Sequence, residues 1–114
     1  PAVKARKMLG NKKIIGVSVS SLKEALEAQK QPIDYIAIGA IFKTPVKSDY
    51  KLVGLNILKQ IAKRIKVPIV AIGGINEKNI REVKAAGVTR IAVVRAILEA
   101  KNPYSATKSL LEKI

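Results

Sequence analysis

The feature that most constrains the fold is a regular alternation between short, almost uninterrupted apolar runs and longer amphipathic segments. Four apolar runs recur along the chain, at residues 14–19, 35–42, 68–72 and 90–94. They do not alternate with polar residues, which is typical of strands that are covered on both faces. Such strands alternating with helices build parallel βα units. We therefore predict an α/β protein with four parallel βα units.

The segments between the apolar runs have the spacing of amphipathic helices. Residues 55–65 place leucine and isoleucine side chains on one stripe, with lysines opposite. Ser21 and Glu24 form a capping-box pattern at the start of another helix. A last helix is expected to start near Pro103.

Two adjacent glycines, Gly73 and Gly74, end the third apolar run just before a helix start. A tight turn from strand to helix needs the backbone freedom that glycine has. Bare amides near a helix N-terminus also bind anions, phosphate above all. The residues by themselves leave both explanations open. Asn76 is the expected N-cap of the next helix, and Gly87 is expected to end it.

Composition narrows the chemistry that the chain can perform. The 114 residues are 48% hydrophobic, which predicts one folded domain over residues 1–114. Cysteine and histidine are absent, so disulfides, thiolate chemistry and the commonest metal ligand are excluded. No apolar run has the length of a membrane span, and the first residues lack the apolar core of a signal peptide. We expect a soluble cytoplasmic protein.

The net charge is strongly positive, with 22 Lys and Arg against 8 Asp and Glu, or +14. Such a surface attracts polyanions and steers phosphorylated substrates. The basic residues are spread along every segment, and aromatic residues that could stack on bases are not interleaved with them. A nucleic-acid-binding module is therefore the third choice among the possible functions.

Four βα units are half of a closed (βα)8 barrel, which usually needs about 250 residues. An isolated half would expose two sheet edges and the strand face meant for the barrel interior. We predict a parallel (βα)4 half of a TIM-type barrel, flanked by helices. It is expected to pair with a second half, either another copy of itself or a complementing N-terminal half. A small open sandwich is the structural alternative.

Polar and flexible residues follow the ends of all four predicted strands. Ligands bind at this edge of parallel α/β folds. A hydroxyl, an ammonium, free amides and a guanidinium together form an anion cradle. Each residue also has a structural explanation, as a cap, a loop former or a strand end, but their joint placement on one rim favours phosphate binding. The residues are Ser18, Ser20, Thr44, Lys47, Gly73, Gly74 and Arg95.

Four stretches in order carry a family resemblance across almost the whole chain. They read IIGVSVSSLKEALEA, DYIAIGAIFKTPVKSD, VPIVAIGGIN and GVTRIAVVRAILEAKNP. The chain resembles the C-terminal half of the thiamine-phosphate synthase family, also called thiamine-phosphate pyrophosphorylase, with its thiazole-tautomerase relatives. The resemblance implies a (βα)8 barrel that joins a pyrimidine diphosphate to a thiazole phosphate, with Mg²⁺, and releases pyrophosphate. Ionisation of the pyrimidine pyrophosphate leaves a polyanion, which cationic and hydrogen-bonding groups stabilise.

The resemblance also implies roles for individual residues. Ser18 and Lys47 would contact the pyrimidine diphosphate. The other implied phosphate-binding residues, mostly around the thiazole phosphate, are Thr44, Pro45, Val46, Gly73, Gly74, Val94 and Arg95.

Several positions depart from the family pattern. Val46 replaces a threonine and cannot donate a hydrogen bond, and Arg95 stands where the family usually has serine. Ser20 replaces the histidine expected in the tautomerase branch, which argues against that chemistry. Among the acidic residues only Asp49 falls in an expected rim loop, so this half offers no Mg²⁺ site.

We therefore expect a thiamine-phosphate synthase-like protein whose family requires Mg²⁺. The resemblance places the metal carboxylates and the pyrimidine-recognising residues in the half that this sequence lacks. The chain alone is expected to be inactive, and no catalytic or metal-binding residue is assigned. The alternative is a non-catalytic half-barrel that binds phosphorylated ligands and dimerises. No membrane partner is expected.

Overall fold

Four parallel strands form a single sheet in the computed structural model, which describes residues 1–43 and 51–114. The strands lie in the order β1-β2-β3-β4, so each pairs with the next along the chain. This confirms the parallel βα arrangement. Every strand is shorter than its apolar run. Their bounds are Gly16–Val19 (β1), Tyr35–Ile38 (β2), Ile69–Ile72 (β3) and Arg90–Ala92 (β4).

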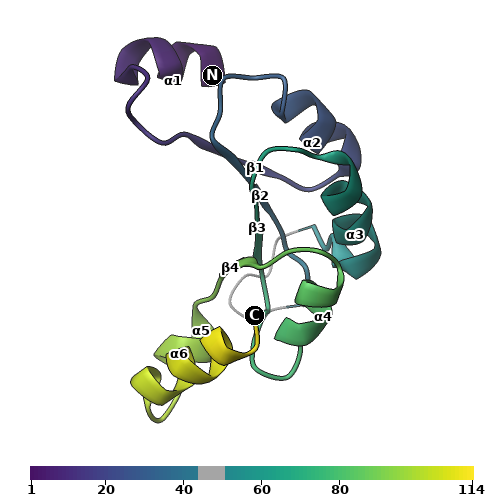
Figure 1. Cartoon of the computed structure of the whole chain (residues 1–114), viewed down its shortest axis with the longest axis vertical. Coiled ribbons are helices and arrows are strands. Elements are labelled where there is room, and N and C mark those ends of the chain that lie inside the picture. Colours follow the sequence, from purple (N-terminus) through teal and green to yellow (C-terminus); the bar gives the residue numbers. More distant parts are fainter. Residues whose placement is uncertain (44–50) are drawn as a thin grey trace.

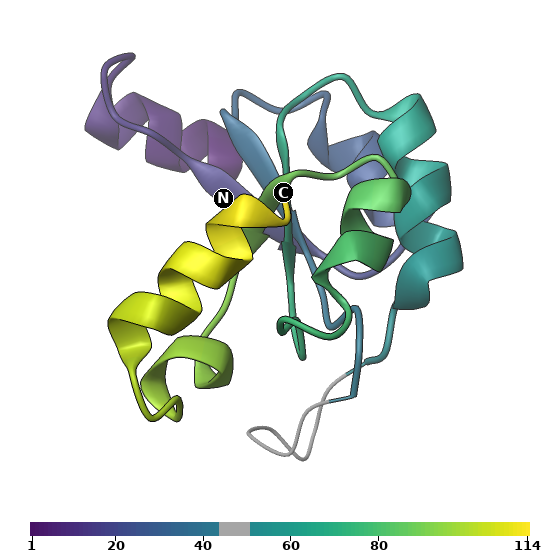
Figure 2. The same cartoon turned by 60° about the horizontal axis from the view of Figure 1, so that its bottom comes forward.

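Six helices are described, and they lie on different sides of the sheet. Figure 1 shows α2, α3 and α4 on one side, whereas α1 and the α5–α6 pair flank the opposite side; Figure 2 shows the same division. Within residues 1–43 and 51–114, no helix is long and apolar enough to cross a membrane. The bounds are Ala2–Leu9 (α1), Leu22–Ala28 (α2), Gly54–Arg64 (α3), Ile80–Ala85 (α4), Arg95–Leu98 (α5) and Pro103–Glu112 (α6).

The hydrophobic core lies between the sheet and helices α2, α3 and α4. It is almost entirely aliphatic, and full burial of one such side chain is worth about 1.5–3 kcal/mol. The apolar stripe predicted for residues 55–65 provides the side chains that α3 contributes to this core. The largest side chains with almost no exposure are Ile36, Ile38, Ile41, Leu58, Ile61, Ile80 and Val83.

The other face of the sheet is open. The strand register places Ser18, Ala37, Val70 and Arg90 in one row across this face. Ser18 and Arg90 are exposed, and Ile72, on the same face, is 39% exposed. The expectation that the strands are covered on both faces is therefore wrong for the described chain. In a half-barrel the helices cover only the outer face of the sheet. The inner face is exposed because the strands that would pack against it across a closed barrel are not present in the described part of the chain.

The predicted helix boundaries are mostly confirmed. The Ser21 hydroxyl accepts a hydrogen bond from the backbone N–H of Glu24 at 3.1 Å, and the Glu24 carboxylate accepts one from the N–H of Ser20. Helix α6 begins at Pro103 as expected. The N-cap prediction for Asn76 is wrong in detail, because the residue before α4 is Asn79.

Asn76 instead closes the turn that leads into α4. Its side-chain oxygen accepts hydrogen bonds from the backbone N–H groups of Lys78 and Asn79, and the Asn79 oxygen accepts one from the Asn76 N–H at 2.8 Å. Three backbone donors that precede the helix are therefore satisfied locally. Gly87 follows the end of α4 with a positive φ of 101°, as predicted.

Helix α1 is attached to the sheet by polar contacts, because none of its residues is buried. The Arg6 guanidinium donates to the backbone oxygens of Pro32 and Lys13 and to the carboxylate of Asp34 at 2.9 Å. The same carboxylate oxygen accepts a hydrogen bond from the N–H of Ile15 at 2.7 Å. The hydrogen bond from the Ile15 N–H, and after it the one from Arg6, lowers the pKa of Asp34 below its ordinary value of 3.8.

The Asp34 contacts predict an acid-dependent loss of stability. Because folding lowers the pKa of this carboxyl, its contribution is present above the ordinary pKa and disappears as the pH falls through the folded-state pKa. Urea unfolding as a function of pH should show the wild type losing more stability than Asp34→Asn over that acidic range. Parallel pH profiles for the two proteins would contradict the assignment.

Candidate functional site

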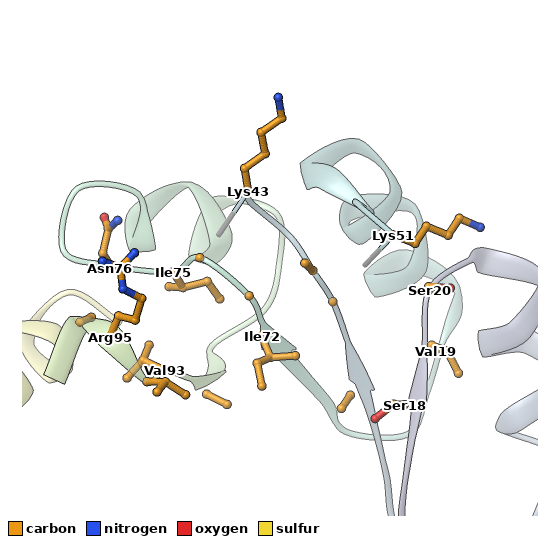
Figure 3. Close-up of a pocket in the computed structure, with 18 residues that line it drawn as sticks. Ser18, Val19, Ser20, Lys43, Lys51, Ile72, Ile75, Asn76, Val93 and Arg95 are labelled. Atoms are coloured by element: carbon orange, nitrogen blue, oxygen red, sulfur yellow. The ribbon is translucent and has the colours of Figure 1, made fainter. Parts of the chain in front are cut away.

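A cavity of about 590 Å³ lies at the C-terminal edge of the sheet. Its walls come from the ends of all four strands and from the segments that follow them. Figure 3 shows Ser18 and Ser20 on one side, Arg95 and Asn76 on the opposite side, and Ile72 between them. Six of the residues predicted from the sequence line it together: Ser18, Ser20, Gly73, Gly74, Val94 and Arg95.

The other predicted residues belong to the segment between β2 and α3. Thr44, Pro45, Val46 and Lys47 lie outside the described residues. Lys43 and Lys51 stand on either side of that segment and line the cavity. Figure 3 shows both lysine side chains extending away from the cavity.

Gly73 and Gly74 are required by the way the chain after β2 packs against the chain after β3. Both have positive φ angles, 107° and 66°. A Cβ on Gly73 would lie 2.6 Å from the Cα of Ala40, and one on Gly74 would lie 2.8 Å from the backbone oxygen of Lys43. The N–H of Phe42 also donates to the Gly73 oxygen at 3.0 Å. The glycine pair therefore allows two rim segments to approach more closely than any side chain permits.

The loop after Gly74 is tied to helix α6. The Ser109 hydroxyl and the Lys113 ammonium both donate to the Glu77 carboxylate, the second at 2.9 Å. These contacts lower the pKa of Glu77. Asn79 also donates from its side-chain amide to the Gly74 oxygen at 2.9 Å. The loop that forms this wall is thus fixed by contacts with α6 and by a hydrogen bond within the loop itself.

Arg95 faces the cavity and is paired with the C-cap residue of its own helix. Glu99, one helical turn later, accepts hydrogen bonds from Nε and Nη2 of the guanidinium, the second at 2.8 Å. The pairing raises the pKa of Arg95 and lowers that of Glu99, so both groups are charged at neutral pH. The side chains are 43% and 56% exposed, so the pair is screened by solvent.

Sequence reasoning missed several residues of this cavity. The sequence predicts only a helix-cap role for Asn76, yet Asn76 lines the wall beside Gly74. Lys51 carries no motif that separates it from the other lysines. The Arg95–Glu99 pair has a readable signal in its i,i+4 spacing, which favours ion pairs on a helix.

The described part of the cavity does not fit a magnesium ion. Mg²⁺ is usually held through one or two carboxylates, and no aspartate or glutamate stands among the described lining residues. Likewise, no group of three or more possible metal-ligating side chains occurs in residues 1–43 and 51–114. Asp49, the acidic residue expected in the rim loop, lies outside the described residues.

The fold and the cavity define a class: half of a TIM-type barrel with a ligand-sized cavity at the C-terminal ends of its strands. A family model described as thiamine monophosphate synthase matches residues 1–97. The chain therefore belongs to the thiamine monophosphate synthase family, which confirms the resemblance.

Individual relatives agree with this assignment. The thiamine-phosphate synthase of Methanobrevibacter smithii is 45% identical over 99% of this chain and 54% of its own length. That of Ruminiclostridium cellulolyticum is 46% identical over 98% of this chain and 53% of its own length. The structure of thiamine phosphate pyrophosphorylase from Pyrococcus furiosus superposes with a TM-score of 0.91 and 42% identity, covering 99% of this chain and 54% of that one. The chain thus spans about half the length of these relatives.

The glycine packing generates a stability prediction. Gly74→Ala and Gly54→Ala both place a side chain at a positive φ, which costs about 1–3 kcal/mol. At Gly74 the new Cβ also meets the backbone after β2, whereas at Gly54 no described atom lies within 4 Å. Denaturant unfolding should therefore show Gly74→Ala to be less stable than Gly54→Ala by about a further 1–3 kcal/mol. Equal losses would show that the close approach is not tight.

Proposed function

We propose that this chain supplies the phosphate-binding rim of a thiamine-phosphate synthase. The observation that carries the proposal is the cavity at the strand ends, where Ser18, the glycine pair and Arg95 stand together in a member of this family. The proposed substrates are hydroxymethylpyrimidine diphosphate and thiazole phosphate.

In the proposed reaction a carbon–oxygen bond breaks and a carbon–nitrogen bond forms. The pyrophosphate leaves the pyrimidine methylene carbon with the bonding electron pair, and the thiazole nitrogen then bonds to that carbon. The departing group gains negative charge, so fixed hydrogen-bond donors and cations around it lower the barrier. Lys47 and Ser18 are the proposed contacts to the pyrophosphate.

The thiazole phosphate is proposed to bind at the opposite wall. Gly73 and Gly74 leave the backbone there without side chains, so a phosphate can approach the main chain closely. Arg95 adds a guanidinium to this wall, and Thr44 with the segment after it is proposed to complete the site. Mg²⁺, if bound, is proposed to take its carboxylate ligands from the part of the barrel outside this chain.

We further propose that four more βα units cover the open face and complete the barrel. Both edge strands, β1 and β4, have one neighbour in the described sheet. Large apolar side chains are exposed on both flanks of that face: Met8 is 77% and Ile14 77% exposed on the β1 side, and Leu98 is 75% exposed on the β4 side. A layer that bridges both edges would bury these side chains together with the interior face.

Charge favours a complementary half over a second copy of this chain. The β1 flank carries Lys4, Lys7, Lys12 and Lys13 beside its exposed apolar residues. Two copies would each carry a net charge of +14 over the whole chain and would repel one another. An acidic complementary half would instead attract this chain.

Substrate binding is tested with Lys47→Ala. Loss of a charge-assisted contact to phosphate should weaken pyrophosphate binding by about ten- to 150-fold, because such a contact is worth about 1.5–3 kcal/mol. Calorimetric titration with pyrophosphate and thiazole phosphate provides the measurement. Lys63→Ala, on the exposed side of α3, is the matched control for net charge. Equal affinities in the two variants would remove Lys47 from the site, and tighter binding of an oligonucleotide than of either ligand would favour nucleic-acid binding instead.

Assembly is tested by mixing this chain with the part of the Methanobrevibacter smithii relative that it does not match. Light scattering should show an equimolar complex, and the complex should make thiamine phosphate where the chain alone does not. Leu98→Gln should weaken the complex, whereas Lys63→Gln should not, because Lys63 lies on the helix-covered side. A chain that stays monomeric at micromolar concentration and ignores the added half would contradict the proposal.

A further inference from the structure

One wall of the cavity is built from two segments that are separate along the chain. The loop after β3 provides Gly74 and Asn76, and the start of α5 provides Arg95. The pairing of β3 with β4 ends at Ile72 and Ala92, before either segment begins. The sheet alone therefore does not fix the separation of the two segments.

Helix α6 contacts both segments of this wall. It packs against α5, and Figures 1 and 2 show the two helices side by side. Near its C-terminal end, the Ser109 hydroxyl and the Lys113 ammonium donate to the Glu77 carboxylate in the loop after β3. Lys113 also donates to the Ser109 oxygen at 2.8 Å. Leu110 is 6% exposed, so this part of α6 is anchored in the core. Helix α6 thus bridges the loop and α5.

The contact at Glu77 acts on the whole loop, although Glu77 itself does not line the cavity. Within the loop, the Asn79 side chain donates to the Gly74 oxygen at 2.9 Å and accepts from the Asn76 N–H at 2.8 Å. These bonds join both ends of the loop. A contact that holds Glu77 in place therefore also holds Gly74 and Asn76 in place.

We infer that Glu77 is a positioning residue, which holds the wall at Gly74 and Asn76 at the separation from Arg95 that a phosphate ester needs. The inference rests on the proposed thiazole phosphate site. A phosphate that meets the bare backbone and the guanidinium at once requires both segments in place. Without the contact to α6 the loop occupies this arrangement for a smaller fraction of the time, and the apparent affinity falls by that fraction.

Charge and position predict opposite effects when Glu77 is removed. Loss of a carboxylate makes the surroundings more positive, so charge alone would tighten the binding of any anion. Loss of position would weaken it. Ser109→Ala separates the two effects, because it removes a donor to Glu77 without a change in charge, and alanine favours a helix. Because Glu77 is 59% exposed, the effect should be about two- to fivefold, which is the range for exposed ion pairs.

The experiment titrates thiazole phosphate and pyrophosphate separately into wild type, Glu77→Ala and Ser109→Ala by calorimetry. Both variants should bind thiazole phosphate about two- to fivefold more weakly than wild type. Pyrophosphate affinity should not fall, because its proposed contacts, Ser18 and Lys47, do not include this wall. Ser105→Ala makes the same change at an exposed position of α6 and is the matched control. In both variants, hydrogen exchange at the Asn76 amide should become faster, whereas exchange in β2 should not change.

Four results would overturn the inference. They are tighter binding of thiazole phosphate by Glu77→Ala, equal weakening of both ligands, an equal effect in Ser105→Ala, and unchanged exchange at Asn76. Any of these, with thiazole phosphate still bound by wild type, would leave the proposed function standing. A wild type that does not bind thiazole phosphate would contradict the proposed function and the inference together.

Discussion

The structure depends on burying one face of a short parallel sheet beneath three helices. The aliphatic side chains of β2, α3 and α4 that meet in this core leave almost no exposed surface. Because adjacent strands are parallel and in sequence order, this packing brings every C-terminal strand end to the same edge. The cavity and its polar rim are a consequence of that arrangement. These helices do not cover the opposite face of the sheet, which therefore stays exposed.

The glycine pair illustrates how a packing requirement and a binding opportunity arise from one geometry. Positive φ angles and the approach of the backbone at Ala40 and Lys43 account for Gly73 and Gly74 without any ligand. The same lack of side chains leaves the main chain accessible at the cavity wall. Both explanations that the sequence left open are therefore compatible, and the structural one rests directly on the contacts. Phosphate binding remains the proposed part.

The strands and α3 could be predicted because their hydrophobic residues recur with a clear period. Helices α1 and α5 carry no such pattern and could not be predicted. The four strands, the α3 stripe and the Ser21 cap follow from patterns that tertiary packing preserves. Helix α1 was missed because none of its side chains is buried, so no apolar stripe marks it. Helix α5 spans only four residues, too few for periodicity to register. The cavity residues were predictable at strand ends, but the role of Asn76 depends on a turn that pairs it with Asn79.

Helix α1 has a further consequence, because a single arginine network joins it to the rest of the described chain. A helix of eight residues is marginal in water without packing of an apolar face. Its backbone amides should therefore exchange with solvent far faster than those of β2 or α3. Once another layer buries Met8 and its neighbours, that difference should narrow. Hydrogen exchange at the backbone amides of α1 would thus report, residue by residue, whether further strands have completed the barrel.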